Sequence, residues 1–135
     1  MTLWTVFCGI YGGAILVSLW GGFSVRSFLA RHSSISDRRA LDAFKVLARW
    51  NMYLALLQIG VMGTGFVLGV LLILRFGALR GLGAILVANG IVLGLGMVFK
   101  PYEVRARSLP AATPELAAEY AHVSETWVHR PLPDF

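Results

Sequence analysis

The chain has 135 residues, enough for one domain, and 57% of them are hydrophobic whereas only 14% are charged. Soluble domains carry about 25% charged residues, so the composition argues against an ordinary soluble domain. The single cysteine, Cys8, excludes a disulfide framework within the chain and a metal centre built from cysteines, and we interpret it as a small hydrophobic side chain.

Three stretches of the sequence contain no Asp, Glu, Lys, Arg or His, and each is about as long as the ~20 residues that a helix needs to cross a membrane. The first lacks the basic start of a signal peptide and has a longer apolar run, so we expect it to remain attached as a span. The sequence therefore predicts an all-α integral membrane protein with three transmembrane helices, at about residues 3–23, 50–74 and 82–99.

The charges between the predicted spans indicate an orientation. The connection at residues 24–49 carries six basic side chains, whereas the second connection carries only Arg75 and Arg80. Basic residues in short loops stay on the cytoplasmic side, so we expect Met1 outside and the C-terminus in the cytoplasm, in a membrane of the bacterial plasma (inner) membrane type. Trp20 and Trp50 then lie at the cytoplasmic interface, where tryptophan is enriched.

The basic connection is expected to be partly helical. Ser34, followed by Asp37 three residues later, resembles a capping box, and no helix breaker separates this stretch from the second span. We expect one long helix over about residues 36–74, preceded by a polar connection at 24–35. The basic residues are expected to hold this segment inside and to contact lipid headgroups, with docking of a partner protein as the alternative. We expect no nucleic-acid partner, because the basic residues share their helix with an apolar stripe suited to a membrane. They are Arg26, Arg31, Arg38, Arg39, Lys45 and Arg49.

Residues 100–135 are interpreted as a tail, separate from a three-helix bundle at residues 1–99. Thr113 followed by Pro114 and Glu115 is typical of a helix start, and Pro131 ends a helix predicted over about 114–130. The tail carries five acidic and four basic residues, so we expect its helix to pack against the basic connection. Helical spacing puts four side chains on the packing face: Leu116, Tyr120, Val123 and Trp127.

Glycine pairs at four-residue spacing occur in every predicted span, together with one asparagine in the middle of the third. In lipid there is little hydrophobic drive between helices, so close backbone approach and hydrogen bonds matter more. The predicted helix-packing or partner residues are Gly9, Gly13, Gly65, Gly69, Asn89, Gly90 and Gly94. Depth along the helices suggests hydrogen bonds between Asn89 and Thr64 and between Gln58 and Ser18. Alternatively, Asn89 and Gln58 face a pigment, a quinone headgroup or a helix of another protein.

The spans lack the titratable side chains of haem ligation and proton relays. The histidines (His32, His122 and His129) lie outside the spans, and we interpret them as solvated rather than as metal ligands. No common catalytic motif is present, and we interpret Asp37 and Asp42 as surface ion-pair partners of the neighbouring arginines rather than as catalytic acids. We predict no cofactor and leave a bound lipid or pigment open.

The sequence favours a small non-catalytic membrane subunit that packs through glycine-lined helix faces against a larger membrane complex or against itself. Its expected partners are membrane lipids and other membrane subunits, or further copies in a homo-oligomer. A small oligomeric transporter or channel is the first alternative. It would require a polar path, which only Ser18, Gln58, Thr64 and Asn89 could line. A membrane enzyme acting on lipid or quinone is the second alternative.

Overall fold

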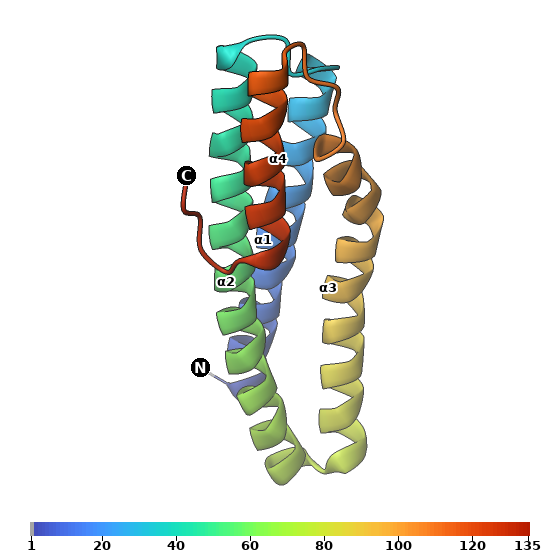
Figure 1. Ribbon diagram of the computed structural model, residues 1–135. Coiled ribbons are helices and arrows are strands. Elements are labelled where there is room, and N and C mark those ends of the chain that lie inside the picture. Colours follow the sequence, from blue (N-terminus) through green and yellow to red (C-terminus); the bar gives the residue numbers. More distant parts are fainter. Residues whose placement is uncertain (1) are drawn as a thin grey trace. The chain divides into compact units, whose positions relative to one another are not determined.

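The computed structural model describes residues 2–135 and consists of four helices joined by short connections (Figure 1). The helices are α1 (Leu3–Arg31), α2 (Arg38–Phe76), α3 (Ala78–Ala106) and α4 (Pro114–His129). The first three are long and apolar enough to cross a membrane. The predicted fold class, an all-α protein with three span-length helices and a tail helix, is therefore confirmed. The side of the membrane that each terminus faces stays a prediction, and Met1 lies outside the described residues.

Two of the long helices extend well beyond the predicted spans. α1 continues to Arg31, so the first part of the expected polar connection is helical rather than a loop. Val25 and Phe28 are buried in this extension, and such tertiary packing stabilises a helix more than local propensity does. α3 likewise continues to Ala106 and contains Pro101, although the third span was expected to end near residue 99.

The start of α2 differs from the expected capping box. The side chain of Asp37, not that of Ser34, accepts a hydrogen bond from the main-chain N–H of Ala40 at 2.8 Å. Ile35 is fully buried and extended, and it forms an isolated parallel bridge with Ala111. The N–H of Ile35 donates to the carbonyl of Pro110 at 2.8 Å. The residues before Asp37 therefore pair with the tail and do not join the helix.

The connection between α2 and α3 is a single residue, Gly77, with a φ of +92°. Glycine adopts this left-handed conformation without steric cost, and its N–H donates to the carbonyl of Ile73 at 2.9 Å. Gly81 then passes directly over Ile73, where a Cβ atom would collide with both the side chain and the backbone of Ile73. The second connection, expected between the spans at residues 75–81, is therefore mostly helix.

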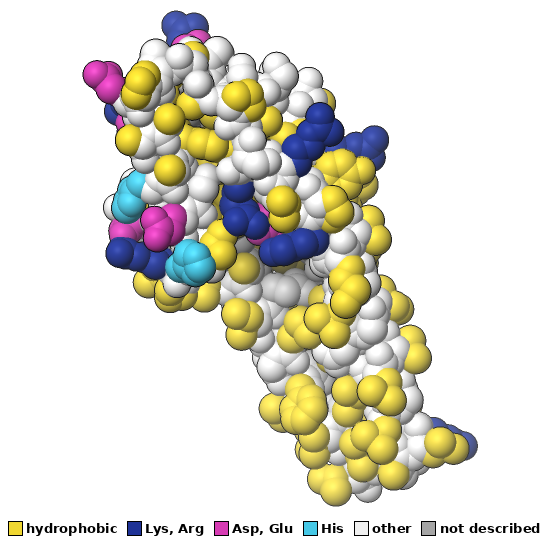
Figure 2. Space-filling model, turned by 45° about the vertical axis from the view of Figure 1, so that its right-hand side comes forward, with side chains coloured by type: hydrophobic (Ala, Val, Ile, Leu, Met, Phe, Trp, Pro, Cys, Tyr) yellow, Lys and Arg dark blue, Asp and Glu magenta, His cyan; other side chains and the backbone are white. Residues whose placement is uncertain are grey.

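The chain forms two compact units, and each long helix contributes to both. Unit 1 comprises the residues up to Leu19 together with Leu57–Val98, and unit 2 comprises Trp20–Leu56 and Phe99–Phe135. The division within α3, after Val98, lies next to the expected boundary between residues 99 and 100. The difference is that residues 20–56, which include the basic connection, belong with the tail and not with the three-helix bundle. On the face drawn in Figure 2, charged side chains gather on unit 2, whereas unit 1 shows mainly hydrophobic and uncharged surface.

Each unit has its own core. In unit 1 the buried side chains are Phe7, Tyr11, Ala14, Leu72 and Val92. In unit 2 helix α4 lies alongside the first half of α2 (Figure 1), and Phe44 contacts the rings of Phe28, Tyr120 and Trp127. The predicted packing face of the tail helix is confirmed, because Tyr120 and Val123 are buried and Leu116 and Trp127 pack against the same core.

Candidate functional site

Asn89 forms the central polar contact of unit 1. Its side-chain amide donates to the hydroxyl of Tyr11 at 2.9 Å and to the carbonyl of Ile85 at 2.8 Å. The predicted bond to Thr64 is wrong, because the Thr64 hydroxyl instead donates to the carbonyl of Gly60 at 3.0 Å. Tyr11 was missed by sequence reasoning. Its depth could have revealed it, since a phenol in the middle of an apolar helix needs a hydrogen-bond partner.

Gln58 is the least satisfied polar residue of unit 1. Its amide nitrogen and oxygen are both buried, and neither has a hydrogen-bond partner within residues 2–135. The predicted bond between Gln58 and Ser18 is therefore wrong. Depth alone put the two side chains at one level, but a hydrogen bond also requires that both point into the same gap between helices.

Two of the predicted glycines serve packing inside unit 1. A Cβ atom at Gly65 would lie 2.6 Å from the ring of Tyr11, and one at Gly69 would collide with Ile85. Real Cβ atoms essentially never approach so closely, so only glycine lets these side chains seat against the backbone of α2. Gly65 and Gly69 are thus contact residues within the chain and are not free to meet a partner.

The other predicted glycines point away from this core. A Cβ atom at Gly9, Gly13, Gly90 or Gly94 would meet no atom within 4 Å. The same holds for five further glycines of the apolar runs: Gly12, Gly60, Gly63, Gly83 and Gly96. At about 100° per residue, Gly90 and Gly94 lie opposite the buried Val92. Gly9 and Gly13 likewise lie opposite the buried Tyr11 on α1. Each long helix therefore has an outward glycine face.

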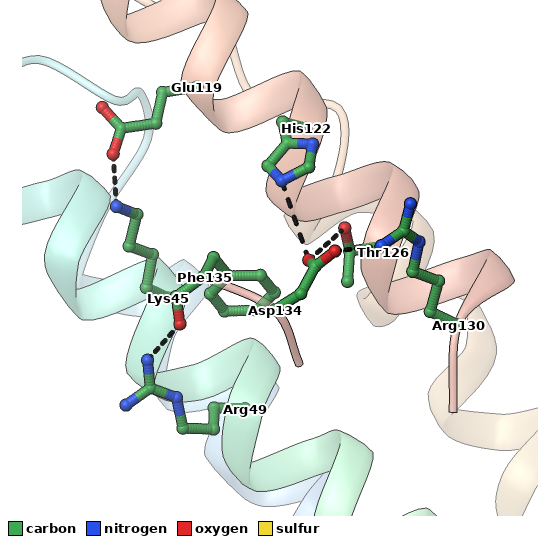
Figure 3. A network of polar contacts seen from close by, with 8 residues as sticks. All are labelled: Lys45, Arg49, Glu119, His122, Thr126, Arg130, Asp134 and Phe135. Carbon is green, nitrogen blue, oxygen red and sulfur yellow. Dashed lines mark hydrogen bonds and ion pairs between the residues drawn. The ribbon is translucent and has the colours of Figure 1, made fainter. Parts of the chain in front are cut away.

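The basic connection divides into paired and unpaired residues. Glu119 of α4 accepts from Arg38 at 2.7 Å and from Lys45, so the predicted packing of the tail helix against the basic connection is confirmed. Arg49 donates to the main-chain oxygen of Phe135, and its guanidinium lies 5.9 Å from the centre of that ring (Figure 3). Among residues 2–135, no acidic partner lies within ion-pair distance of three of the predicted headgroup-binding residues: Arg26, Arg31 and Arg39.

The contacts of α4 change two ionisation equilibria in opposite directions. The hydrogen bond from Lys45, aided by the charges of Lys45 and Arg38, lowers the pKa of Glu119 below its ordinary value. Burial raises the pKa of Tyr120, whose hydroxyl donates to the carbonyl of Ala106 at 2.5 Å and accepts from the N–H of Leu109 at 3.0 Å. Both groups are therefore held in the form they adopt at neutral pH, Glu119 charged and Tyr120 neutral.

The last residues fold back onto α4 around Asp134 (Figure 3). Its carboxylate accepts from the hydroxyl of Thr126 at 3.1 Å and from Arg130, and it lies 3.7 Å from the ring nitrogen of His122. Together with the Arg49–Phe135 contact, this network fastens the end of the chain against both α4 and α2.

The geometry of the helices is the guide to the function of this protein. Within residues 2–135 no group of three His, Cys, Asp or Glu side chains is placed to hold a metal ion. No protein-family model, curated protein or solved structure matches the chain. The features that a functional proposal must explain are thus the outward glycine faces, the internal Asn89–Tyr11 contact and the unpaired basic residues.

Proposed function

We propose that this protein is a small non-catalytic membrane subunit. Its outward glycine faces pack against helices of a larger membrane complex or of further copies of itself, and this packing stabilises or positions the assembly. The proposal places unit 2 in the cytoplasm, because the basic residues of the first connection outnumber those of the α2–α3 turn. We further propose the bacterial plasma membrane as its location.

The observation that supports this proposal is the placement of the glycines. A glycine inside a helix is less favourable than alanine by roughly 0.5–1 kcal/mol, so a lipid-facing glycine is a cost without a local gain. Packing inside unit 1 accounts for Gly65 and Gly69, but it leaves Gly83, Gly90 and Gly94 of α3 uncovered. Small residues at such positions allow a second helix to approach closely.

The outward glycine face of α3 also has the ridge and groove that helix packing requires. Leu79, Leu86 and Leu93 are all exposed and recur every seven residues, beside the glycines at 83, 90 and 94. The leucines form a ridge and the glycines a groove, so another helix can fit into the groove while its own side chains contact the ridge. Only 6% of the most apolar part of α3 is buried, compared with 17% for α1 and for α2. The α3 face is therefore the leading candidate for the contact.

The test is gentle extraction of the tagged chain from native membranes, followed by measurement of its mass and its companions. We expect a stoichiometric larger companion or a defined oligomer. The double variant Gly90→Leu with Gly94→Leu fills the groove and should reduce recovery of the assembly by about tenfold or more, a change of about 1.4 kcal/mol. The melting temperature of the isolated chain in detergent should hardly change, because neither glycine is packed within unit 1.

Val128→Leu is the control, since it adds bulk at an exposed position of α4, a helix that contains no glycine. Equal losses in the control and in the glycine variant would contradict the proposal. Recovery of a monomer without companions would contradict it as well. If a homo-oligomer conducted a solute or ion in liposomes, the transporter alternative would replace the subunit function.

A further inference from the structure

A groove lies between α1 and α2 in unit 2. It has a volume of about 310 Å³ and is lined on α1 by Trp20, Ser24, Ser27, Arg31 and neighbouring residues. Its α2 wall is apolar and includes Val46 and Trp50. The volume is at the lower end of the range for small-molecule sites, about 300–1,000 Å³.

The α1 side of the groove changes from apolar to basic along its length. Trp20, Ser24, Ser27 and Arg31 follow one another at spacings of four, three and four residues, so they lie on one stripe of the helix. The stripe is about 16 Å long at 1.5 Å per residue. It begins at an aromatic ring, passes two hydroxyl groups and ends at a guanidinium. A ligand that fits it must therefore have an apolar end and an anionic end.

Arg31 is exposed and has room for an anion from outside the chain. Arg38 and Lys45 pair with Glu119, and Arg49 contacts Phe135, but Arg31 has no acidic partner among residues 2–135. Beside it, His32 stacks on Phe28 with the ring centres 4.6 Å apart, and its Nδ1 lies 3.2 Å from the carbonyl of Phe28. This end of the groove thus presents the positive charge of Arg31 beside the stacked rings of His32 and Phe28.

The position of the groove along α1 and α2 matches the surface of a membrane. Trp20 and Trp50 are 71% and 59% exposed and flank the ends of the charge-free runs, where tryptophan marks the boundary between hydrocarbon and headgroups. Arg31 lies farther along α1, but Cα–Cβ bonds tilt toward the helix N-terminus. Its long side chain can therefore reach back toward Ser27, at the level of lipid phosphates.

We propose that this groove binds the headgroup of an anionic phospholipid. The phosphate pairs with Arg31 and accepts a hydrogen bond from the hydroxyl of Ser27, while the upper part of an acyl chain lies between Trp20 and Trp50. The groove holds the headgroup and not the whole lipid, which agrees with its volume. The site is independent of the glycine faces, so it can be tested whether or not the subunit proposal holds.

The test uses the full chain in detergent, with phosphatidylglycerol or phosphatidylcholine of identical acyl chains added in turn. Lipid retention is measured by mass spectrometry of the intact complex. We expect one phosphatidylglycerol to be retained, and Arg31→Gln to weaken its binding by about tenfold, as for the loss of a charge-assisted hydrogen bond. Ser27→Ala should weaken binding less, and Trp20→Leu should weaken both lipids by a similar factor.

Arg39→Gln is the matched control, because Arg39 is an exposed arginine of the same connection that does not line the groove. Equal effects of Arg31→Gln and Arg39→Gln would show diffuse surface attraction and overturn the proposal. Equal retention of both lipids would also overturn it, as would a polypeptide cross-linked to the groove in native membranes. Melting curves of each variant separate loss of the site from loss of the fold.

Discussion

Unit 1 and unit 2 are built from segments of the same three helices but are stabilised in different ways. In unit 1 two glycines receive the side chains of Tyr11 and Ile85, and one asparagine forms the central polar contact. In unit 2 large side chains around Phe44 form a core, and ion pairs surround it. The difference corresponds to the expected solvents, because burial of large apolar side chains is favourable in water but contributes little between helices in lipid.

The largest predicted effect concerns the core of unit 2. Phe44 is fully buried against three aromatic rings, so Phe44→Ala should destabilise unit 2 by about 3–5 kcal/mol. Hydrogen exchange should become fast in α4, whereas the amides of unit 1 should stay protected. Val128→Ala removes an apolar group that is 48% exposed on α4 and should change exchange very little. Equal loss of protection in both units would mean that they unfold together.

The second effect tests the glycine packing of unit 1. Gly69→Ala introduces a methyl group that collides with Ile85, and we expect a loss of about 1–3 kcal/mol in stability in detergent. Gly60→Ala adds the same methyl group on the same helix where no atom lies within 4 Å. This control should be neutral or slightly stabilising, because alanine favours a helix more than glycine does. If both variants had the same melting temperature, close packing at Gly69 would not contribute to the stability of unit 1.

A smaller effect is expected from the Asn89–Tyr11 hydrogen bond. Interhelical hydrogen bonds in membranes average about 0.6 kcal/mol and reach about 1.7 kcal/mol. The variants Asn89→Leu and Tyr11→Phe, combined in a double-mutant cycle, should give a coupling free energy in that range. Asn89→Leu combined with Thr64→Val should give no coupling, since those two side chains bond elsewhere. A measured coupling to Thr64 but none to Tyr11 would contradict the contact.

The smallest effect lies at the surface of unit 2. Because its partners lower the pKa of Glu119, this group stabilises the folded unit above its ordinary pKa of 4.5, and the contribution is lost as the pH falls through the lowered value. Limited proteolysis should therefore release the tail more readily at pH 3 than at pH 7, and Glu119→Gln should reduce that dependence. Glu119→Lys should weaken protection at neutral pH, whereas Glu125→Lys, at an exposed residue, should not. Identical proteolysis of both lysine variants would refute the role of the pair.

Much of the fold followed from composition and helical spacing. The absence of charge over three long stretches predicted the apolar helices, and the Thr113–Pro114 start predicted α4, whose Thr113 side chain accepts from the N–H of Leu116. The spacing of Tyr120 and Val123 predicted the buried face of the tail. These are local properties, set by 3.6 residues per turn and by the preferences of single residues, so the order of residues along the chain contains them.

The contacts between helices required the tertiary structure. A glycine pair in the sequence looks the same whether it faces inward, as Gly65 and Gly69 do, or outward, as Gly90 and Gly94 do. The partner of Asn89, the unpaired amide of Gln58 and the groove ending at Arg31 likewise depend on how the helices are rotated about their axes. That rotation is decided by side chains that meet across helix boundaries. Sequence alone thus determined which segments are helical and apolar, and only packing decided which face of each helix stays free.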